Sequence, residues 1–205
     1  MRSKPLWKPK AEEVETSLLN LFFNYLEKNK HLKNNRIFAD LWKWTIKNPD
    51  IFWSEFWDFS KIIGDKGKRV IDKNKIFNQN KFFSDSKINY AENILKKKSN
   101  DIAINFLSES GLEEKISWNS LYEKVCKFSF YLKSLSLKKG DRVAAYVPNK
   151  IETIISFLAC AKNGIIWSSC SPDFGSQGVI ERFKQIEPKV LITSDYYFYN
   201  GKKIN

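Results

Sequence analysis

The sequence predicts an α/β protein, in which a mostly helical amino-terminal extension precedes the first βα units of a parallel sheet. Two observations carry this prediction. Before residue 60 the apolar residues recur at helical spacing, whereas beyond residue 100 short apolar runs alternate with helical segments. Strands and helices that alternate across short loops imply right-handed crossovers and a parallel sheet.

The composition is that of a folded protein with a basic excess. Of 205 residues, 42% are apolar and seven are tryptophan, which supplies a core and excludes a disordered chain. The formal charge is +12, and 30 of the 35 cations are lysines scattered among asparagines. We therefore expect no nucleic-acid partner; a basic nucleic-acid module is the alternative, and its binding would weaken steeply with salt.

Cysteine usage and the amino terminus indicate the compartment. Cys126, Cys160 and Cys170 are odd in number and widely spaced, so neither a disulfide framework nor a zinc cluster is expected. The start, MRSKPLWKPK, lacks the apolar segment of a secretory signal. No apolar run approaches the ~18 residues of a membrane span, so no membrane association is expected. The sequence predicts a cytoplasmic protein.

Two helices are expected first in the extension. Residues 10–28 form the first, and residues 36–46 form the second. At helical spacing the first has Val14, Leu18, Phe22 and Tyr25, and the second has Phe38, Leu41, Trp42 and Thr45.

A third helix starts at Asn48-Pro49-Asp50, with Asn48 as cap and Pro49 at the first helical position. It carries an aromatic stripe typical of a core or a docking surface, made of Phe52, Trp53, Phe56 and Trp57. We interpret this stripe as the way the extension attaches to the rest of the protein.

The domain boundary is predicted after residue 96. Residues 61–85 have weak periodicity and suggest loops with irregular strands. A short helix over 88–95 then leads into the polar linker 96–100. The predicted domains are therefore 1–96 and 97–205.

Alternating elements fill the second domain. Strands are expected over 102–107, 115–118, 142–147, 165–167 and 190–193, and helices over 117–135, 151–162 and 177–186. Gly164 stands where a helix end needs a left-handed residue.

A polar loop should follow the strand 165–167, over residues 168–175. Ligands bind at the carboxyl ends of parallel strands, so this loop is a candidate site. An ordinary strand-to-helix connection is the alternative.

Residues for familiar catalytic chemistry are missing. His31 is the single histidine and lies in a Lys/Asn-rich segment, so it should be a solvent-exposed structural residue rather than a catalytic base. No pair of His or Cys has metal-ligand spacing, and no glycine opens a phosphate-binding GxxxxGK[ST] pattern. We assign no catalytic and no metal-binding residue.

Several segments, in the right order, carry a resemblance to a known family. The run KKGDRVAAYVPNKIETIISFLACAKNGIIWSSCSPDFG and the motif ISWNSL resemble the adenylate-forming acyl-CoA synthetase superfamily. The segments INYAENIL, WSSCSPDFG and RFKQIEPKVLITSDYYFYNGK are similar to its acetoacetate–CoA ligase branch. Residues 41–59 resemble the amino-terminal extension of acetyl-CoA synthetases, which identifies 1–96 as that extension and 97–205 as the start of the AMP-binding domain.

The resemblance implies a ligase that uses ATP, Mg²⁺ and coenzyme A, with acetoacetate and coenzyme A as its small-molecule partners. Acetoacetate attacks the α-phosphate of ATP, giving an acyl-adenylate and pyrophosphate; the coenzyme A thiolate then displaces AMP. The family's ATP-binding loop and catalytic lysine lie beyond Asn205. The resemblance therefore predicts an amino-terminal fragment that is inactive alone. The alternative is a non-catalytic, stand-alone domain that binds a partner or coenzyme A.

The resemblance also implies three cofactor-binding residues. Acetyl-CoA synthetases place an R-x-G-R turn against the 3′-phosphate of coenzyme A; here Gly201 keeps the turn, Lys202 keeps a cation and Tyr199 replaces the first arginine. The family places a Gly-Gly pair near coenzyme A where this chain has Pro172-Asp173. With this substitution, Asp173 is expected to shape a pocket wall specific to the branch instead. Trp167, Ser168 and Ser169 would line the neighbouring strand end. A solvated lysine on a surface turn is the alternative for Lys202.

Overall fold

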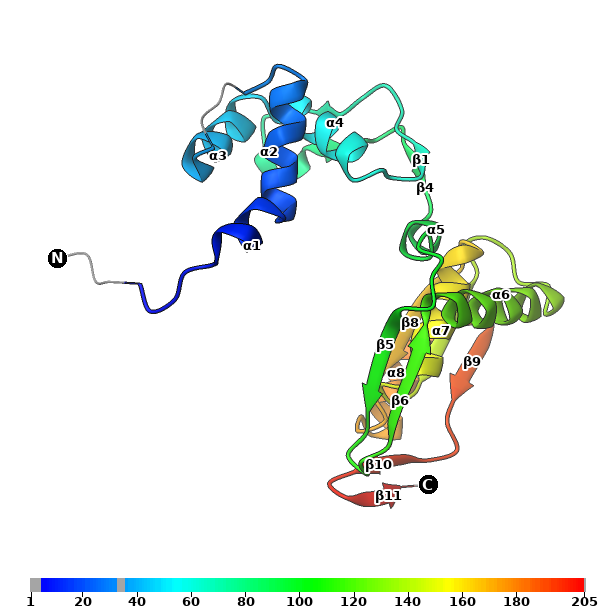
Figure 1. Ribbon diagram of the computed structural model, residues 1–205. Helices are drawn as coiled ribbons and strands as arrows, with labels where there is room; N and C mark the ends of the chain where they lie inside the picture. The colour runs from blue at the N-terminus through cyan, green and yellow to red at the C-terminus, as the bar shows by residue number, and fades with distance from the viewer. Residues whose placement is uncertain (1–4, 33–35, 205) are drawn as a thin grey trace. The chain divides into compact units, whose positions relative to one another are not determined.

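The computed structural model describes residues 5–32 and 36–204 (Figure 1). The chain forms two compact units, Met1–Ile88 and Asn89–Asn205. The division lies before the linker at which the sequence predicts a boundary. The reason is that the Asn89 side chain donates a hydrogen bond of 2.9 Å to the carbonyl of Ala161, which ties the start of the short helix to the second unit.

Four helices open the first unit: α1 (Ala11–Glu15), α2 (Leu18–Lys28), α3 (Phe38–Lys47) and α4 (Pro49–Phe59). The single helix predicted over 10–28 is wrong, because the chain breaks at Thr16 and restarts. Ser17 caps α2 by accepting a hydrogen bond from the amide of Asn20 at 3.2 Å. Such a cap satisfies an amide that would otherwise lack a partner and fixes where the helix begins.

The core of the first unit is smaller than the helical spacing predicts. It consists of Phe22, Phe23, Leu26 and Leu41, with aromatic side chains packed around them. Leu18, by contrast, is 75% exposed, and Val14, Phe38 and Trp42 are exposed as well. The break before α2 takes Val14 off the buried face, and α3 buries a single residue.

Helix α4 connects the helices of this unit to its small strands. It begins at Pro49 as predicted, although the Asn48 side chain donates to the carbonyl of Trp44 and does not cap α4. The aromatic stripe contacts two different groups. Phe52 and Phe56 meet Phe22 edge-on, while Trp53 and Trp57 contact Phe82 and Phe83, respectively.

His31 differs from its expected role as a solvated residue. Its ring is half-buried, with its Nε2 2.8 Å from the Glu55 carboxylate and its ring against Trp44. It is a structural residue that joins α4 to the end of α2.

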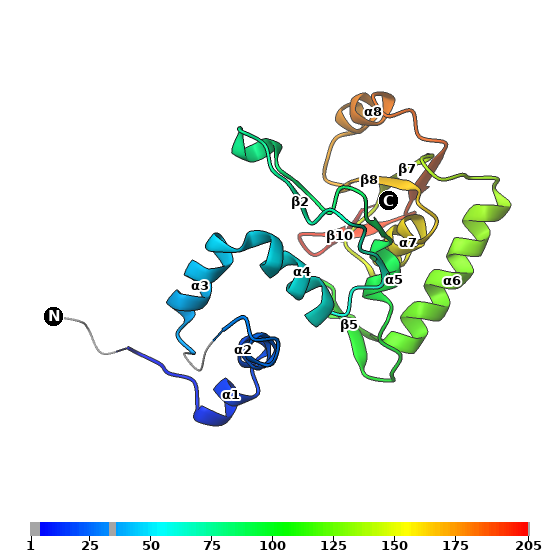
Figure 2. The same cartoon turned by 90° about the horizontal axis from the view of Figure 1, so that it is seen from above.

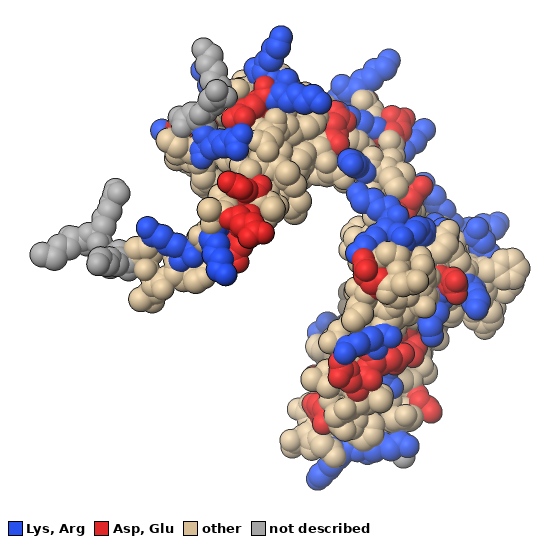
Figure 3. Space-filling view, viewed as in Figure 1, with Lys and Arg blue, Asp and Glu red and all other residues tan. Residues whose placement is uncertain are grey.

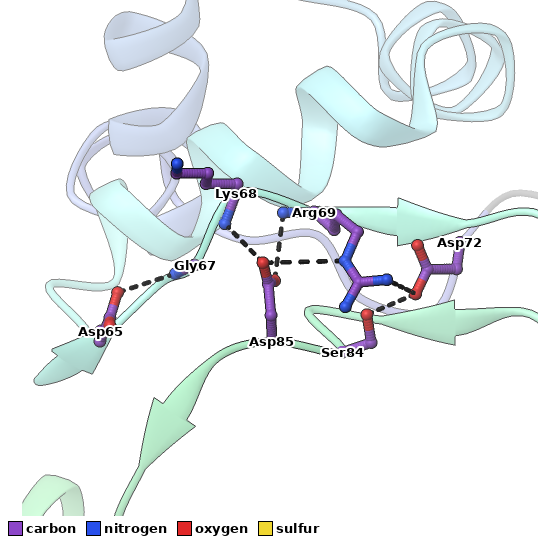
Figure 4. A network of polar contacts seen from close by, with 7 residues as sticks. All are labelled: Asp65, Gly67, Lys68, Arg69, Asp72, Ser84 and Asp85. Atoms are coloured by element: carbon purple, nitrogen blue, oxygen red, sulfur yellow. Dashed lines mark hydrogen bonds and ion pairs between the residues drawn. The ribbon is translucent and has the colours of Figure 1, made fainter.

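Short paired segments follow α4: β1 (Gly64–Asp65) with β4 (Lys87–Ile88), β2 (Ile71–Asp72) with β3 (Lys81–Phe82), and the 3-10 turn η1 (Phe77–Gln79). One carboxylate joins the segment between β1 and β2 to the segment between β3 and β4 (Figure 4). Asp85 accepts hydrogen bonds from the amides of Lys68 and Arg69, both at 3.1 Å, and pairs with the Arg69 guanidinium at 3.7 Å. These amides, first that of Lys68, lower the pKa of Asp85.

Glycine is required beside this carboxylate. Gly67 has a φ of +72°, and a Cβ there would overlap the Asp85 side chain. Both the backbone conformation and the space exclude a larger residue.

The second unit contains helix α5 (Tyr90–Ile94) and an antiparallel pair, β5 (Ile102–Leu107) and β6 (Glu113–Ser117). The remaining elements are α6 (Trp118–Ser134), β7 (Arg142–Tyr146), α7 (Ile151–Lys162), β8 (Ile166–Cys170), α8 (Ser176–Lys184), β9 (Val190–Thr193), β10 (Tyr197–Tyr199) and β11 (Lys202–Ile204). Strands β8, β7 and β9 form a parallel sheet in that order. The predicted α/β class is confirmed.

Helices cover both faces of this sheet. Val143 of β7 belongs to a core cluster with Ile155, Leu158 and Ala159 of α7. Its neighbour Ala144 belongs to another cluster with Val179 and Phe183 of α8. Because successive residues of a strand face opposite sides, α7 and α8 lie on opposite faces (Figure 2).

Two features of the second unit differ from the expected elements. Strand β8 continues to Cys170, so Ser168 and Ser169 lie in the strand and not in a loop, because each pairs with an alanine of β7. The chain also ends in a β10–β11 hairpin that the strand pattern does not predict. Asn200 and Gly201 at its turn have φ values of 49° and 72°, as a two-residue Asn-Gly hairpin turn requires.

Charge and apolarity are spread over the surface. On the face shown in Figure 3, Lys and Arg side chains are interspersed with Asp and Glu. Within the residues that the structure describes, no helix combines the length and apolarity needed to cross a membrane.

Replacing Gly67 by alanine should destabilise the first unit by about 2 kcal/mol, because the new methyl group meets Asp85 and the backbone stays left-handed. Urea unfolding followed by tryptophan fluorescence measures the loss. Gly111→Ala is the matched control, since Gly111 has a similar φ of +79° but open space around it. An equal loss in both variants would contradict the proposed clash.

Acid should weaken the segment around Asp85. The folded-state pKa of this group is lowered, so its stabilisation is present above the unfolded pKa and is lost as pH falls through the folded value. Between about pH 5 and about pH 2, the wild type should lose stability more steeply than Asp85→Asn. Parallel pH profiles of the two proteins in thermal unfolding would refute this role.

Candidate site at the carboxyl ends of the parallel strands

A cavity of about 430 Å³ lies at the carboxyl ends of β7 and β9. Its lining comes from the segment between β7 and α7, the first turns of α7, one residue near the start of β8, and the end of β9 with the residues that follow it. These residues are Val147, Pro148, Lys150, Glu152, Thr153, Ser156, Trp167, Ile192, Thr193, Ser194 and Asp195.

The local sequence explains how this cavity forms. Strand β7 ends at Tyr146, and Pro148 follows, which has no amide hydrogen to continue a ladder. The Thr153 hydroxyl then donates to the carbonyl of Pro148 at 2.7 Å, which closes the turn into α7. Polar side chains therefore gather where the apolar strands end.

Trp167 lies in the cavity wall, but near the start of β8 and not at the strand end where it was expected. Its ring contacts Phe157 of α7, and its Nε1 donates to the Ser169 hydroxyl at 3.2 Å. Ser168 and Ser169 were expected beside it, but neither lines this cavity. They pair with Ala144 and Ala145 of β7 instead.

Lys150 lines both this cavity and a second one of about 410 Å³. The second cavity is bounded by the carboxyl end of β5 and the start of β10. The Lys150 Nζ lies 5.0 Å from the centre of the Tyr196 ring, and the Lys203 Nζ lies 4.2 Å from it. Cation–π attraction therefore holds two ammonium groups near the same aromatic ring.

The segment after β8 forms a tight turn. The amide of Phe174 donates to the carbonyl of Ser171 at 3.2 Å, which leaves Pro172 and Asp173 at the two central positions. The Asp173 side chain is exposed. Asp173 therefore lies at the tip of a turn and not in either of the two cavities.

Two tyrosine hydroxyls donate hydrogen bonds to backbone carbonyls of this turn. The Tyr146 hydroxyl lies 2.7 Å from the carbonyl of Pro172 and 2.8 Å from that of Phe174, and donates to both. The Tyr197 hydroxyl donates to the carbonyl of Pro172 at 3.2 Å. Through Tyr197, strand β10 contacts the turn that carries Asp173.

Gly201 and Lys202 lie in the terminal hairpin and are exposed. The amide of Gly201 donates to the Glu109 carboxylate at 3.4 Å. Lys202 pairs with Tyr199 across the hairpin. The structure thus brings the hairpin and the Asp173 turn together through Tyr197, while Gly201 and Lys202 line neither of the two cavities beside Lys150.

Two titratable side chains of the second unit stay protonated at neutral pH. Burial raises the pKa of the Cys160 thiol to about 12, so it stays protonated at neutral pH. Burial, and then the nearby Tyr197 and Asp173, raise the pKa of Tyr146, so its hydroxyl keeps the hydrogen that it donates. Among the described residues, no group of three or more His, Cys, Asp or Glu side chains is placed to hold a metal ion.

Sequence reasoning missed Tyr146, Lys150 and Tyr196 at this edge. The rule that selected the loop after β8 also applies to the residues after β7 and β9, and would have found all three. Tyr197 gave no such signal, because its position depends on the β10–β11 hairpin.

Comparison with known proteins supports the same family. Residues 91–204 match the model of the family described as AMP-binding enzyme. Acetoacetyl-coenzyme A synthetase of Rhizobium meliloti (strain 1021) is 39% identical over 98% of this chain, and acetoacetyl-CoA synthetase of Xenopus tropicalis is 38% identical over 99% of it. The solved acetoacetyl-CoA synthetase from Streptomyces lividans matches 98% of the chain with a TM-score of 0.87 and 29% identity.

These matches cover only part of each relative. The chain spans 31% of the Rhizobium protein, 30% of the Xenopus protein and 32% of the Streptomyces chain. Within that third, both units of the structure are included. The chain belongs to the family of AMP-binding enzymes.

Proposed function

We propose that this chain forms the amino-terminal part of an acetoacetate–CoA ligase. Such a ligase converts ATP, acetoacetate and coenzyme A into acetoacetyl-CoA, AMP and diphosphate. The observation that carries the proposal is the similarity to acetoacetyl-CoA synthetases over 98% of the chain, across both units.

The reaction has two steps. A carboxylate oxygen of acetoacetate bonds to the α-phosphorus of ATP, and pyrophosphate leaves. The thiolate of coenzyme A then bonds to the activated carbonyl carbon, and AMP leaves with the electron pair of the broken C–O bond. The first step needs cations against the developing phosphate charge.

The described residues do not supply an ATP site of that kind. No cluster of carboxylates or histidines among them is suited to Mg²⁺, and no glycine-rich phosphate loop occurs in the sequence. We therefore infer that this chain alone does not adenylate acetoacetate.

The coenzyme A step suits the residues of the second unit better. Lys202 is an exposed cation on a fixed hairpin, which fits a phosphate. The amide of Gly201 is already bonded to Glu109, so the lysine and not the turn would make the contact. Asp173 repels phosphate and fits a different part of the ligand, the uncharged arm that carries the thiol.

The two parts of the chain have different roles in this proposal. Residues 1–96 form the extension typical of acetyl-CoA synthetases, and 97–205 begin the AMP-binding domain, in support of which the family match starts at residue 91. The partners are acetoacetate and coenzyme A, and the setting is the cytoplasm.

Pyrophosphate exchange tests the ligase proposal. A protein of the relatives' length that carries this chain should exchange labelled pyrophosphate into ATP in the presence of acetoacetate. The 205-residue chain alone should show no acetoacetate-dependent exchange above background, because no glycine-rich phosphate-binding loop occurs in its sequence. Detectable exchange by the short chain would overturn the division of labour, and no exchange by the long protein would overturn the ligase.

Lys202→Ala should raise the KM for coenzyme A about twofold to fivefold in the long protein, since an exposed charge contributes modestly. The variant should also lose any preference for coenzyme A over dephospho-coenzyme A. Lys133→Ala, which removes an exposed charge from α6, serves as the control. Identical kinetics for both variants would remove Lys202 from the site.

A further inference from the structure

Three side chains contact the turn over residues 171–174, which lies in the exposed connection between β8 and α8. The Tyr146 hydroxyl contacts the carbonyls of Pro172 and Phe174 at 2.7 and 2.8 Å, and the Tyr197 hydroxyl contacts that of Pro172 at 3.2 Å. The Arg182 guanidinium lies 4.6 Å from the centre of the Phe174 ring. The peptide units that follow Pro172 and Phe174 are therefore held in place, although the Asp173 side chain between them is exposed.

Tyr146 is well placed to act as a rigid support. Its ring packs against the cluster of Ala144, Cys170, Val179 and Phe183 between the sheet and α8. The ring cannot move without disturbing that cluster, so the position of the hydroxyl is set by the core. A single O–H hydrogen is shared between two carbonyls, which orients both peptide planes with one group.

The hydrogen bonds to the two carbonyls also require that the Tyr146 hydroxyl is protonated. Burial raises the pKa of Tyr146, followed by the nearby Tyr197 and Asp173. An ionised phenolate would have no hydrogen to share and would repel the carbonyl oxygens. With its pKa raised above the ordinary value for tyrosine, Tyr146 stays protonated at neutral pH and can donate to both carbonyls.

We infer that Tyr146 is a positioning residue for the thiol-transfer step. Its hydroxyl fixes the Pro172–Asp173 turn, where the arm of coenzyme A approaches the activated carbonyl. This inference rests on the proposed ligase function. It deepens that proposal by separating the two steps: the support matters when coenzyme A binds, and not when ATP reacts with acetoacetate.

Tyr146→Phe is the direct test, because it keeps the ring in its cluster and removes only the hydroxyl. In the long protein, the KM for coenzyme A should rise about threefold to tenfold, while acetoacetate-dependent pyrophosphate exchange should stay within about twofold of the wild type. Tyr131→Phe is the matched control, since Tyr131 lies on α6 with its side chain 54% exposed. It should change neither value.

Hydrogen exchange provides a readout that does not depend on turnover. In Tyr146→Phe, the amide of Phe174 should exchange faster than in the wild type, because the turn it closes has lost its support. The same amide in Tyr131→Phe should exchange at the wild-type rate.

The outcomes separate the two proposals. Wild-type turnover with an unchanged KM for coenzyme A in Tyr146→Phe would overturn the inference and leave the ligase intact. Equal losses in thiol transfer and pyrophosphate exchange would also overturn it, because they would indicate a general structural role. No acetoacetate-dependent exchange in the wild type would overturn the ligase, and the inference with it.

Discussion

The parallel pairing of β7 with β8 on one side and β9 on the other is the constraint on which the second unit depends. Val143, Ala144 and Ala145 of β7 are fully buried, and small side chains let α7 and α8 approach the sheet from both faces. Because all three strands run in the same direction, their carboxyl ends lie at one edge. The cavity beside Trp167 and the turn that carries Asp173 both follow from this arrangement.

Much of this fold could be predicted from sequence, for physical reasons that differ between elements. Apolar spacing identifies α6 and α7 because each buries one continuous face. The same rule fails at α1 and α2, since the Ser17 cap breaks a periodic pattern that the spacing alone reads as one helix. It also places the end of β8 too early, because the pairing of Ser168 and Ser169 with β7 overrides the polarity of the residues.

The candidate site was harder to predict, because it is made of contacts between distant residues. Tyr146 and Pro172 are 26 residues apart, and no pattern within either segment indicates their hydrogen bond. The resemblance selected Asp173, Gly201 and Lys202 one at a time, and their roles remain proposals. The structure adds two contacts. Tyr197 connects the hairpin to the Asp173 turn, and the Glu109 carboxylate accepts a hydrogen bond from the amide of Gly201. These contacts, rather than the residues alone, set the positions of the turn and the hairpin.

The proposed contact surface for coenzyme A is the edge formed by the turn after β8 and the β10–β11 hairpin. Hydrogen exchange of the long protein, with and without coenzyme A, tests this most directly. The account predicts slower exchange at residues 171–175 and 199–202 when coenzyme A is bound, with α3 of the first unit unchanged. Protection confined to other segments, with these two unchanged at saturating coenzyme A, would contradict it.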